Sequence, residues 1–293
     1  NILEDYNYKI KITAYVNGVR IQDFYLEFLV NQSFINLVND EIGMTVTGKG
    51  NFGFNDFPNN LQGIGLEYGN QQNALYEGGF MITQKGNDYV ANGVRSGSGY
   101  KSNDLFSLEK IKIEENNLSQ MIKSKFSDKS DDGINLNDSV ALGIDISQKA
   151  FLFKDENLKQ SILIRYELYN KNDYDMDSFY SGLFFDWDIS SGGQEDYIYF
   201  DTTSNSGIAE SLNSVDLPLI SVSLLSGQKF NCYAIDNAAF ADEMGIYDGF
   251  TDKEKQKALT SGYGRLKSRE SKDVSMVLVA GPMFIPSNKS VIL

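Results

Sequence analysis

The sequence predicts an all-β protein, a large antiparallel β-sandwich of jelly-roll type with one short surface helix. Three observations favour this fold: 19 Phe and 17 Tyr among 293 residues, 26 Gly against only 4 Pro, and short alternating apolar segments bounded by Gly or Asn. Aromatic residues are enriched in strands, and Gly and Asn adopt the backbone conformations of tight turns. Hydrophobic residues make up 41% of the chain, which is enough for a sizeable core.

The first segment reads as a separate hairpin. Residues 8–16 and 21–30 are strand-like and flank Asn17-Gly18, a strong hairpin-turn signal. We expect residues 1–33 to be either the terminal hairpin of a preceding β domain or N-terminal strands of this one. Residues 34–293 are expected to form the large β-sandwich domain.

Further strands are predicted wherever apolar and polar residues alternate along short segments. In the clearest case Arg165 and Glu167 fall on the solvent-facing side of the alternation. Residues 115–140 are polar and are expected to form a loop. Cys232 lies in an alternating apolar stretch and is interpreted as a small core residue. The predicted strands cover residues 42–47, 61–68, 74–82, 140–153, 161–169, 179–189, 197–200, 219–225, 230–235 and 274–279.

One helix is predicted near the end of the chain. Thr251 and Glu254 have the spacing of a capping box, and Gly262 can end the helix that follows. The segment is short and polar on most sides. We interpret it as a surface helix between late strands without a functional role.

The absence of histidine excludes several kinds of chemistry. Ser-His-Asp and Cys-His nucleophiles and all His-ligated zinc or iron sites require a residue type that this chain lacks. The single cysteine excludes an intrachain disulfide. We therefore expect no enzymatic activity in the chain itself.

The net charge of −14 limits the classes of partner. An acidic surface repels phosphate backbones and anionic lipids, so we expect neither nucleic-acid nor membrane-surface binding. The sequence has no apolar run of about 18 residues, so membrane insertion is not expected. Solubility alone accounts for such a charge, and cation binding is the alternative.

The first candidate metal site lies near residue 190. Asp186 and Asp188 are two residues apart on a predicted strand and therefore share a face, where two carboxylates repel unless a cation or a donor lies between them. Clustered carboxylate oxygens suit calcium, the one cofactor that the sequence suggests. The alternative is that one Asp caps the turn at Gly192-Gly193 and the others are solvated. The candidate ligands are Asp186, Asp188, Glu195, Asp196 and Asp201.

The second candidate resembles the start of a calcium-binding loop. Asp128, Ser130 and Asp132 occupy alternating positions before Gly133. The match is loose, because Ser139 stands at the twelfth position where Glu is expected. The alternative is an ordinary polar loop.

A carbohydrate-binding or glycoside-hydrolysing role is the next hypothesis. Asp186 and Asp188 could act as the carboxylate pair of a glycosidase, although many other acidic pairs could be chosen. Trp187 and some of the tyrosines could stack on sugar rings. Trp187 points away from the two aspartates, so a place in the core is at least an equal alternative.

Several sequence strings resemble a large β domain of bacterial secreted multidomain proteins. They include residues 50–58, 62–65, 75–79 and 179–189, and near the end 235–237, 247–255 and 281–282. In order, these strings resemble the opening, the central strand and the end of that domain, over residues 36–293. The domain follows subtilisin-like serine peptidase domains or precedes sorting domains of the type IX secretion pathway.

The resemblance implies a secreted or cell-surface accessory domain with a role in binding or adhesion. Its implied partners are neighbouring domains of the same polypeptide, other surface proteins, or glycans. No catalytic residue carries over, because the peptidase triad would lie outside this chain. A structural subunit of an extracellular surface assembly is a further alternative.

Overall fold

The structure is a computed structural model that describes residues 6–30, 33–69, 73–96, 100–130, 139–214, 216–239, 244–262 and 264–293. The chain divides into two compact units, Asn1–Ser33 and Phe34–Leu293. Whether the first unit belongs to a preceding domain stays a prediction.

The first unit is the predicted antiparallel hairpin of β1 (Tyr6–Val16) and β2 (Val19–Val30). Asn17 and Gly18 both have positive φ, at 49° and 79°, as the two central residues of a type I′ turn require. Ala14 pairs with Gln22 while the next residue, Tyr15, pairs with Arg20, so one residue of β2 is bulged.

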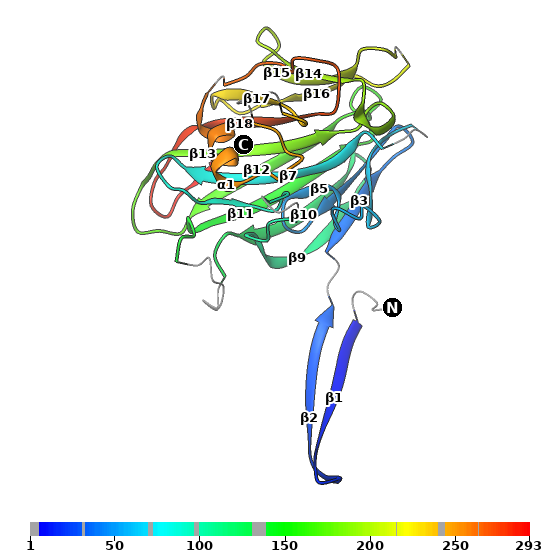
Figure 1. Cartoon of the computed structure of the whole chain (residues 1–293), viewed down its shortest axis with the longest axis vertical. Coiled ribbons are helices and arrows are strands. Elements are labelled where there is room, and N and C mark those ends of the chain that lie inside the picture. Colours follow the sequence, from blue (N-terminus) through cyan, green and yellow to red (C-terminus); the bar gives the residue numbers. More distant parts are fainter. Residues whose placement is uncertain are drawn as a thin grey trace. The chain divides into compact units, whose positions relative to one another are not determined.

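The second unit contains three antiparallel sheets, which confirms the predicted all-β sandwich (Figure 1). The nine-stranded sheet contains β3 (Phe34–Val38), β4 (Ile42–Thr47), β5 (Asn51–Phe54), β6 (Gly63–Tyr68), β7 (Leu75–Gln84), β8 (Val90–Asn92), β13 (Met176–Trp187), β17 (Phe230–Asp236) and β18 (Val274–Ile285). The five-stranded sheet contains β9 (Phe106–Glu115), β10 (Ser119–Ser127), β11 (Ile144–Phe153), β12 (Ile162–Asn170) and β19 (Ser290–Ile292). The three-stranded sheet contains β14 (Asp196–Asp201), β15 (Ser206–Ser211) and β16 (Ile220–Ser223).

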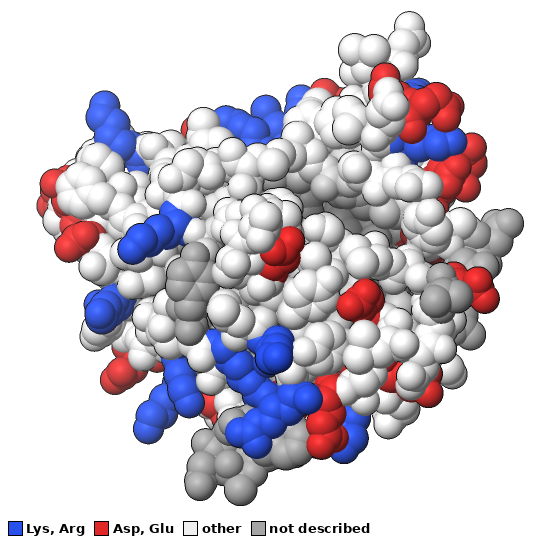
Figure 2. All heavy atoms as spheres, turned by 90° about the horizontal axis from the view of Figure 1, so that it is seen from above, with Lys and Arg blue, Asp and Glu red and all other residues white. Residues whose placement is uncertain are grey.

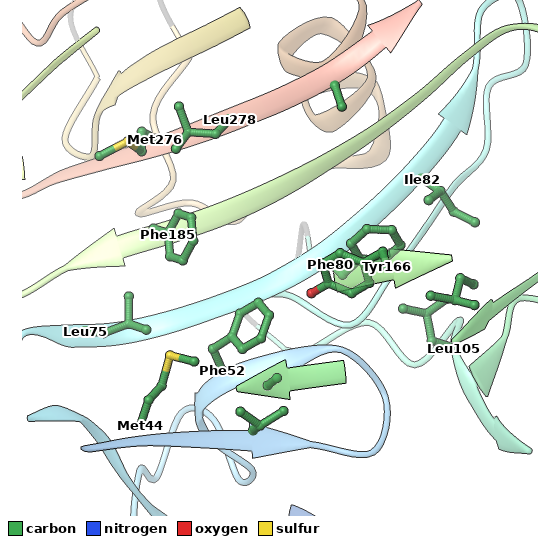
Figure 3. Close-up of a cluster of buried hydrophobic side chains, with 14 of the residues drawn as sticks. Met44, Phe52, Leu75, Phe80, Ile82, Leu105, Tyr166, Phe185, Met276 and Leu278 are labelled. Atoms are coloured by element: carbon green, nitrogen blue, oxygen red, sulfur yellow. The ribbon is translucent and has the colours of Figure 1, made fainter. Parts of the chain in front are cut away.

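The main core lies between the nine-stranded and five-stranded sheets. Phe80 of β7 stacks on Tyr166 of β12 with ring centroids 4.4 Å apart, and it meets Phe126 of β10 edge-on at 6.2 Å. Figure 3 shows the first of these pairs beside Phe52 and Ile82. Burial of each such ring stabilises the fold by about 1.5–3 kcal/mol, so these contacts hold the two sheets face to face.

A short segment joins the nine-stranded sheet to the three-stranded sheet. The carbonyl of Arg265 accepts from the amide of Ala234 in β17 at 2.9 Å. One residue later, the carbonyl of Leu266 accepts from the amide of Phe200 in β14 at 2.7 Å. Residues 265–268 therefore lie between the two sheets and hydrogen-bond to both.

The helix α1 (Asp252–Thr260) covers the outer face of the nine-stranded sheet. The predicted capping box is present, since Thr251 accepts from the amide of Glu254 and the Glu254 side chain accepts from the amide of Thr251. One side of the helix buries Ala258, Leu259 and Lys255 against the sheet. The helix thus seals a second, smaller core rather than lying free in a loop.

The predicted polar loop over residues 115–140 is wrong for its first half. Ser119–Ser127 forms β10, a central strand of the five-stranded sheet. Ile122, Ser124 and Phe126 point inward and are buried, while lysines alternate with them on the outside. The inward serine and the outward lysines lowered the apolar content of the segment and hid its period of two.

Candidate functional site

Three polar residues meet across adjacent strands on the outer face of the nine-stranded sheet. Asp186 of β13 lies directly opposite Glu77 of β7 on one side and Ser275 of β18 on the other. All three are buried. Two carboxylates in such a position repel each other unless a cation or donors lie between them.

Arg95 supplies that cation. Its Nε lies 2.7 Å from Glu77 Oε2, its Nη2 donates to Asp186 Oδ2, and its backbone amide donates to Glu77 Oε1 at 2.7 Å. The guanidinium also lies 5.1 Å from the centroid of the Phe57 ring. Burial opposes the charge of Arg95, but Asp186 and Glu77 together raise its pKa above the usual value. Arg95 therefore forms a buried ion pair with each of the two carboxylates.

The second carboxylate oxygen of Asp186 accepts hydrogen bonds from two neighbouring side chains. Ser275 Oγ and Asn237 Nδ2 donate to Asp186 Oδ1 at 2.7 and 2.8 Å. Asn237 Nδ2 also donates to Asp273, whose other oxygen accepts from the Tyr247 hydroxyl at 2.7 Å. The network thus extends to Asp273, a residue that the sequence did not single out.

Asp188 and Asp273 converge on the backbone of Gly193. A Cβ atom at Gly193 would lie 2.8 Å from Asp188 Oδ1 and 3.5 Å from Asp273 Oδ1, and the φ of Gly193 is +66°. Burial, followed by the charges of Asp186, Asp273 and Asp196, raises the pKa of Asp188 to about 7. Burial and Asp186 also raise the pKa of Asp273. This pair can hold a proton near neutral pH, or it can attract a cation.

The other predicted ligands near residue 190 do not complete one cluster. Asp196 accepts from the amides of Ile189 and Ser190, each at 2.8 Å, and so fixes the turn after β13. Glu195 is exposed. Asp201 lies at the opposite end of β14, where it accepts from a neighbouring amide and hydroxyl. Of the five residues, Asp188 lies near Asp186 and Asp196, and Glu195 lies near Asp196.

At the second predicted calcium loop, a buried side-chain carboxylate accepts hydrogen bonds from backbone amides. Asp128 accepts from the amides of Ile144, at 2.8 Å, and Leu142. Ser130 is half-buried, and Asp132 lies outside the described residues. Across the described ranges, no group of three or more Asp, Glu or Cys side chains is arranged so that it could hold a metal ion.

Trp187 belongs to the core. It is 1% exposed and stacks on Phe185 with centroids 5.0 Å apart, so it does not present a sugar-stacking surface. Tyr247 is the exposed aromatic residue of the network. No local sequence pattern predicts that Tyr247 belongs to this network, because Tyr247, Asn237 and Asp273 come from separate segments that only the fold brings together.

On the face that Figure 2 shows, the surface charges are mixed rather than uniformly acidic. In the view from above, Lys and Arg side chains alternate with Asp and Glu side chains and are separated by uncharged surface (Figure 2). The net charge of −14 therefore does not produce a continuous acidic field on that face.

The raised carboxyl pKa values predict greater stability at mildly acidic pH. In the folded state the pKa is about 7 for Asp188 and about 6 for Asp128, whereas an unfolded Asp has a pKa of about 3.9. The folded state therefore retains protons that the unfolded state loses, and stability falls as pH rises through this window. We expect a higher melting temperature at pH 5.5 than at pH 8 in calorimetry. The Asp188→Asn variant should show a smaller difference in melting temperature between the two pH values. A wild-type melting temperature that is equal at both pH values, or higher at pH 8, would contradict the raised pKa values.

Comparisons with known proteins do not assign the chain to a family. No family model matches it, and a search of curated proteins finds no match. The resemblance to accessory domains of secreted proteins therefore stays a prediction. In the described part of the chain, no helix has the length and apolar character needed to cross a membrane.

Proposed function

We propose that the chain is a non-catalytic binding module of a secreted or surface-anchored bacterial protein. The observation that carries the proposal is the state of Asp186, the central acid of the candidate site. It is 4% exposed, and both of its oxygens accept from fixed donors on Arg95, Ser275 and Asn237. A general acid or base must reach the proton that it transfers, and this carboxylate stabilises the scaffold instead.

Localisation can be tested on the full-length gene product. The proposal expects it in the culture medium or at the cell surface, where added protease cleaves it in intact cells. Recovery in the cytoplasm alone would contradict the extracellular part of the proposal.

A hydrolase is the competing function, and Asp188 and Asp273 are the observation in its favour. Both carboxyl groups have raised pKa values, as the acid of a glycosidase pair does. The purified chain can be incubated with plant, algal and bacterial polysaccharides while reducing ends are measured. We expect no release. Sugar release that Asp188→Asn or Asp273→Asn abolishes would overturn the non-catalytic proposal.

A surface-assembly subunit is favoured by the hairpin unit. Ile12 and Phe24 lie directly opposite each other, as do Val16 and Val19, on one face of the hairpin. All four are more than half exposed, and a two-stranded hairpin alone is at best marginally stable. This alternative predicts oligomers in light scattering that dissociate in the Phe24→Ser variant, and a concentration-independent monomer would remove it.

Calcium is proposed as a stabilising ion at Asp188 and Asp273. Their two carboxylates repel, so a divalent cation that binds between them would stabilise the folded state. We expect millimolar calcium to raise the melting temperature at pH 8 by a few degrees, and less at pH 5.5, where protons compete. The shift should disappear in Asp188→Asn and persist in Glu195→Gln. No shift after chelation and re-addition of calcium would end this proposal.

A further inference from the structure

The outer face of the five-stranded sheet carries a row of four cations. Lys149 of β11 lies directly opposite Arg165 of β12 and Lys123 of β10, and Lys123 lies directly opposite Lys112 of β9. Directly opposed residues share a face, and neighbouring strands lie about 4.8 Å apart. The alternate residue Ala150 is buried in the core, so the row faces solvent.

The sheet neutralises only part of this row, and Lys125 beside it lies directly opposite Glu109. Lys123 pairs with Glu114 at 2.7 Å, and Arg165 approaches Glu167 at 3.5 Å. Within the described ranges, Lys112, Lys149 and also Lys125, two residues beyond Lys123, have no ion-pair partner. Like charges directly opposite each other destabilise a sheet. An acidic protein that keeps such a row has a surface suited to an anionic ligand.

Aromatic rings adjoin the cations. Phe151 and Phe153 are the next outward residues of β11 after Lys149, and both are half-buried. Their rings stack with centroids 6.3 Å apart and an interplanar angle of 10°. Met121 and Leu163 flank Phe151 on the neighbouring strands. The face therefore combines a line of positive charge with an apolar platform.

We propose that this cationic face binds an anionic polysaccharide, a sugar polymer that carries carboxylate or sulfate groups. The face consists of Lys112, Lys123, Lys125, Lys149, Arg165, Phe151 and Phe153. The inference rests on the proposed binding function and names its ligand class. Regularly spaced cations match the repeated charges of a polymer, and the phenylalanine rings offer apolar surface to sugar rings. A nucleic acid is the competing occupant, because the net charge of −14 opposes both kinds of polyanion, and binding of double-stranded DNA in the test below would decide against a polysaccharide.

The test compares ligands and variants by isothermal titration calorimetry. The probes are polygalacturonate and dextran sulfate, with neutral dextran and double-stranded DNA as comparisons. The proposal expects one or both anionic polysaccharides to bind, with an affinity that falls as salt rises, while dextran and DNA do not. Lys123→Glu combined with Lys149→Glu should weaken binding by at least about tenfold, because two attractions become repulsions. Phe151→Ser should weaken binding with less change in the salt dependence.

Lys253→Glu is the matched control. Lys253 is exposed on α1, which covers the outer face of the other sheet, so binding should not change. Melting curves establish that each variant folds. Unchanged affinity in the double variant, equal binding of DNA, or charge-dependent self-association without polysaccharide binding would overturn the proposal. Those results leave the non-catalytic function intact, whereas sugar release from the polymers would contradict that function instead.

Discussion

Replacing Arg95 with Met is expected to lower the free energy of unfolding by about 3–5 kcal/mol, the range measured when one partner of a buried ion pair is removed. The reason is the position of Glu77 and Asp186, which lie directly opposite each other on β7 and β13. Both are buried, and Arg95 contacts both. Without the guanidinium, two uncompensated carboxylates remain in a region of low dielectric constant. Urea or thermal unfolding would measure the loss.

A neutralised variant separates charge from packing. Adding Glu77→Gln and Asp186→Asn to Arg95→Met removes the stranded charges, and we expect it to recover a substantial part of the lost stability. Arg265→Met is a comparison, because Arg265 pairs with Asp236 at a more exposed position. Its cost should be smaller. A loss in Arg95→Met below about 1 kcal/mol, the value of an exposed pair, would show that the network does not stabilise the fold.

Elements with local signals could be predicted from the sequence. The Asn17-Gly18 turn fixes the first hairpin, and the spacing of Thr251 and Glu254 fixes the start of α1. Both signals depend on residues within a few positions of one another. The strand β10 could not be found in this way, because its buried face includes Ser124 and its outer face is rich in lysine.

The candidate site was only partly predictable for a related reason. The spacing of Asp186 and Asp188 predicts a shared face, and the structure brings both near Asp273, although β13 ends at Trp187, one residue before Asp188. The groups that neutralise Asp186 are set by the strand order, because β13 pairs with β7 on one side and with β18 on the other. The sequence leaves a cation and a donor as alternatives, and the structure shows both at Asp186: the Arg95 guanidinium, and the donors Ser275 and Asn237.

The row of cations required the same information. Lys112, Lys123, Lys149 and Arg165 are separated by up to several tens of residues, and they align only because four strands pair in one register. Two of these lysines lie on β9 and β10, and the sequence predicts no strand at β9 and a loop over β10. A net charge of −14 also draws attention away from a local excess of positive charge.

Replacing Asp128 with Ala is expected to cost about 3 kcal/mol, because it leaves two buried amides without an acceptor, at about 1–3 kcal/mol for each unsatisfied donor. The amides belong to Leu142 and Ile144, at the point where the chain enters β11. Hydrogen exchange of these two amides should accelerate more than that of β12. Asp128→Asn keeps one acceptor oxygen and should cost less.

Calcium titration separates this structural role of Asp128 from a role as a calcium ligand. If the Asp128 side chain only accepts hydrogen bonds from the backbone, Asp128→Asn should keep any calcium-dependent rise in melting temperature. Loss of that rise in Asp128→Asn, but not in Asp188→Asn, would show that the ion binds at the Asp128 loop.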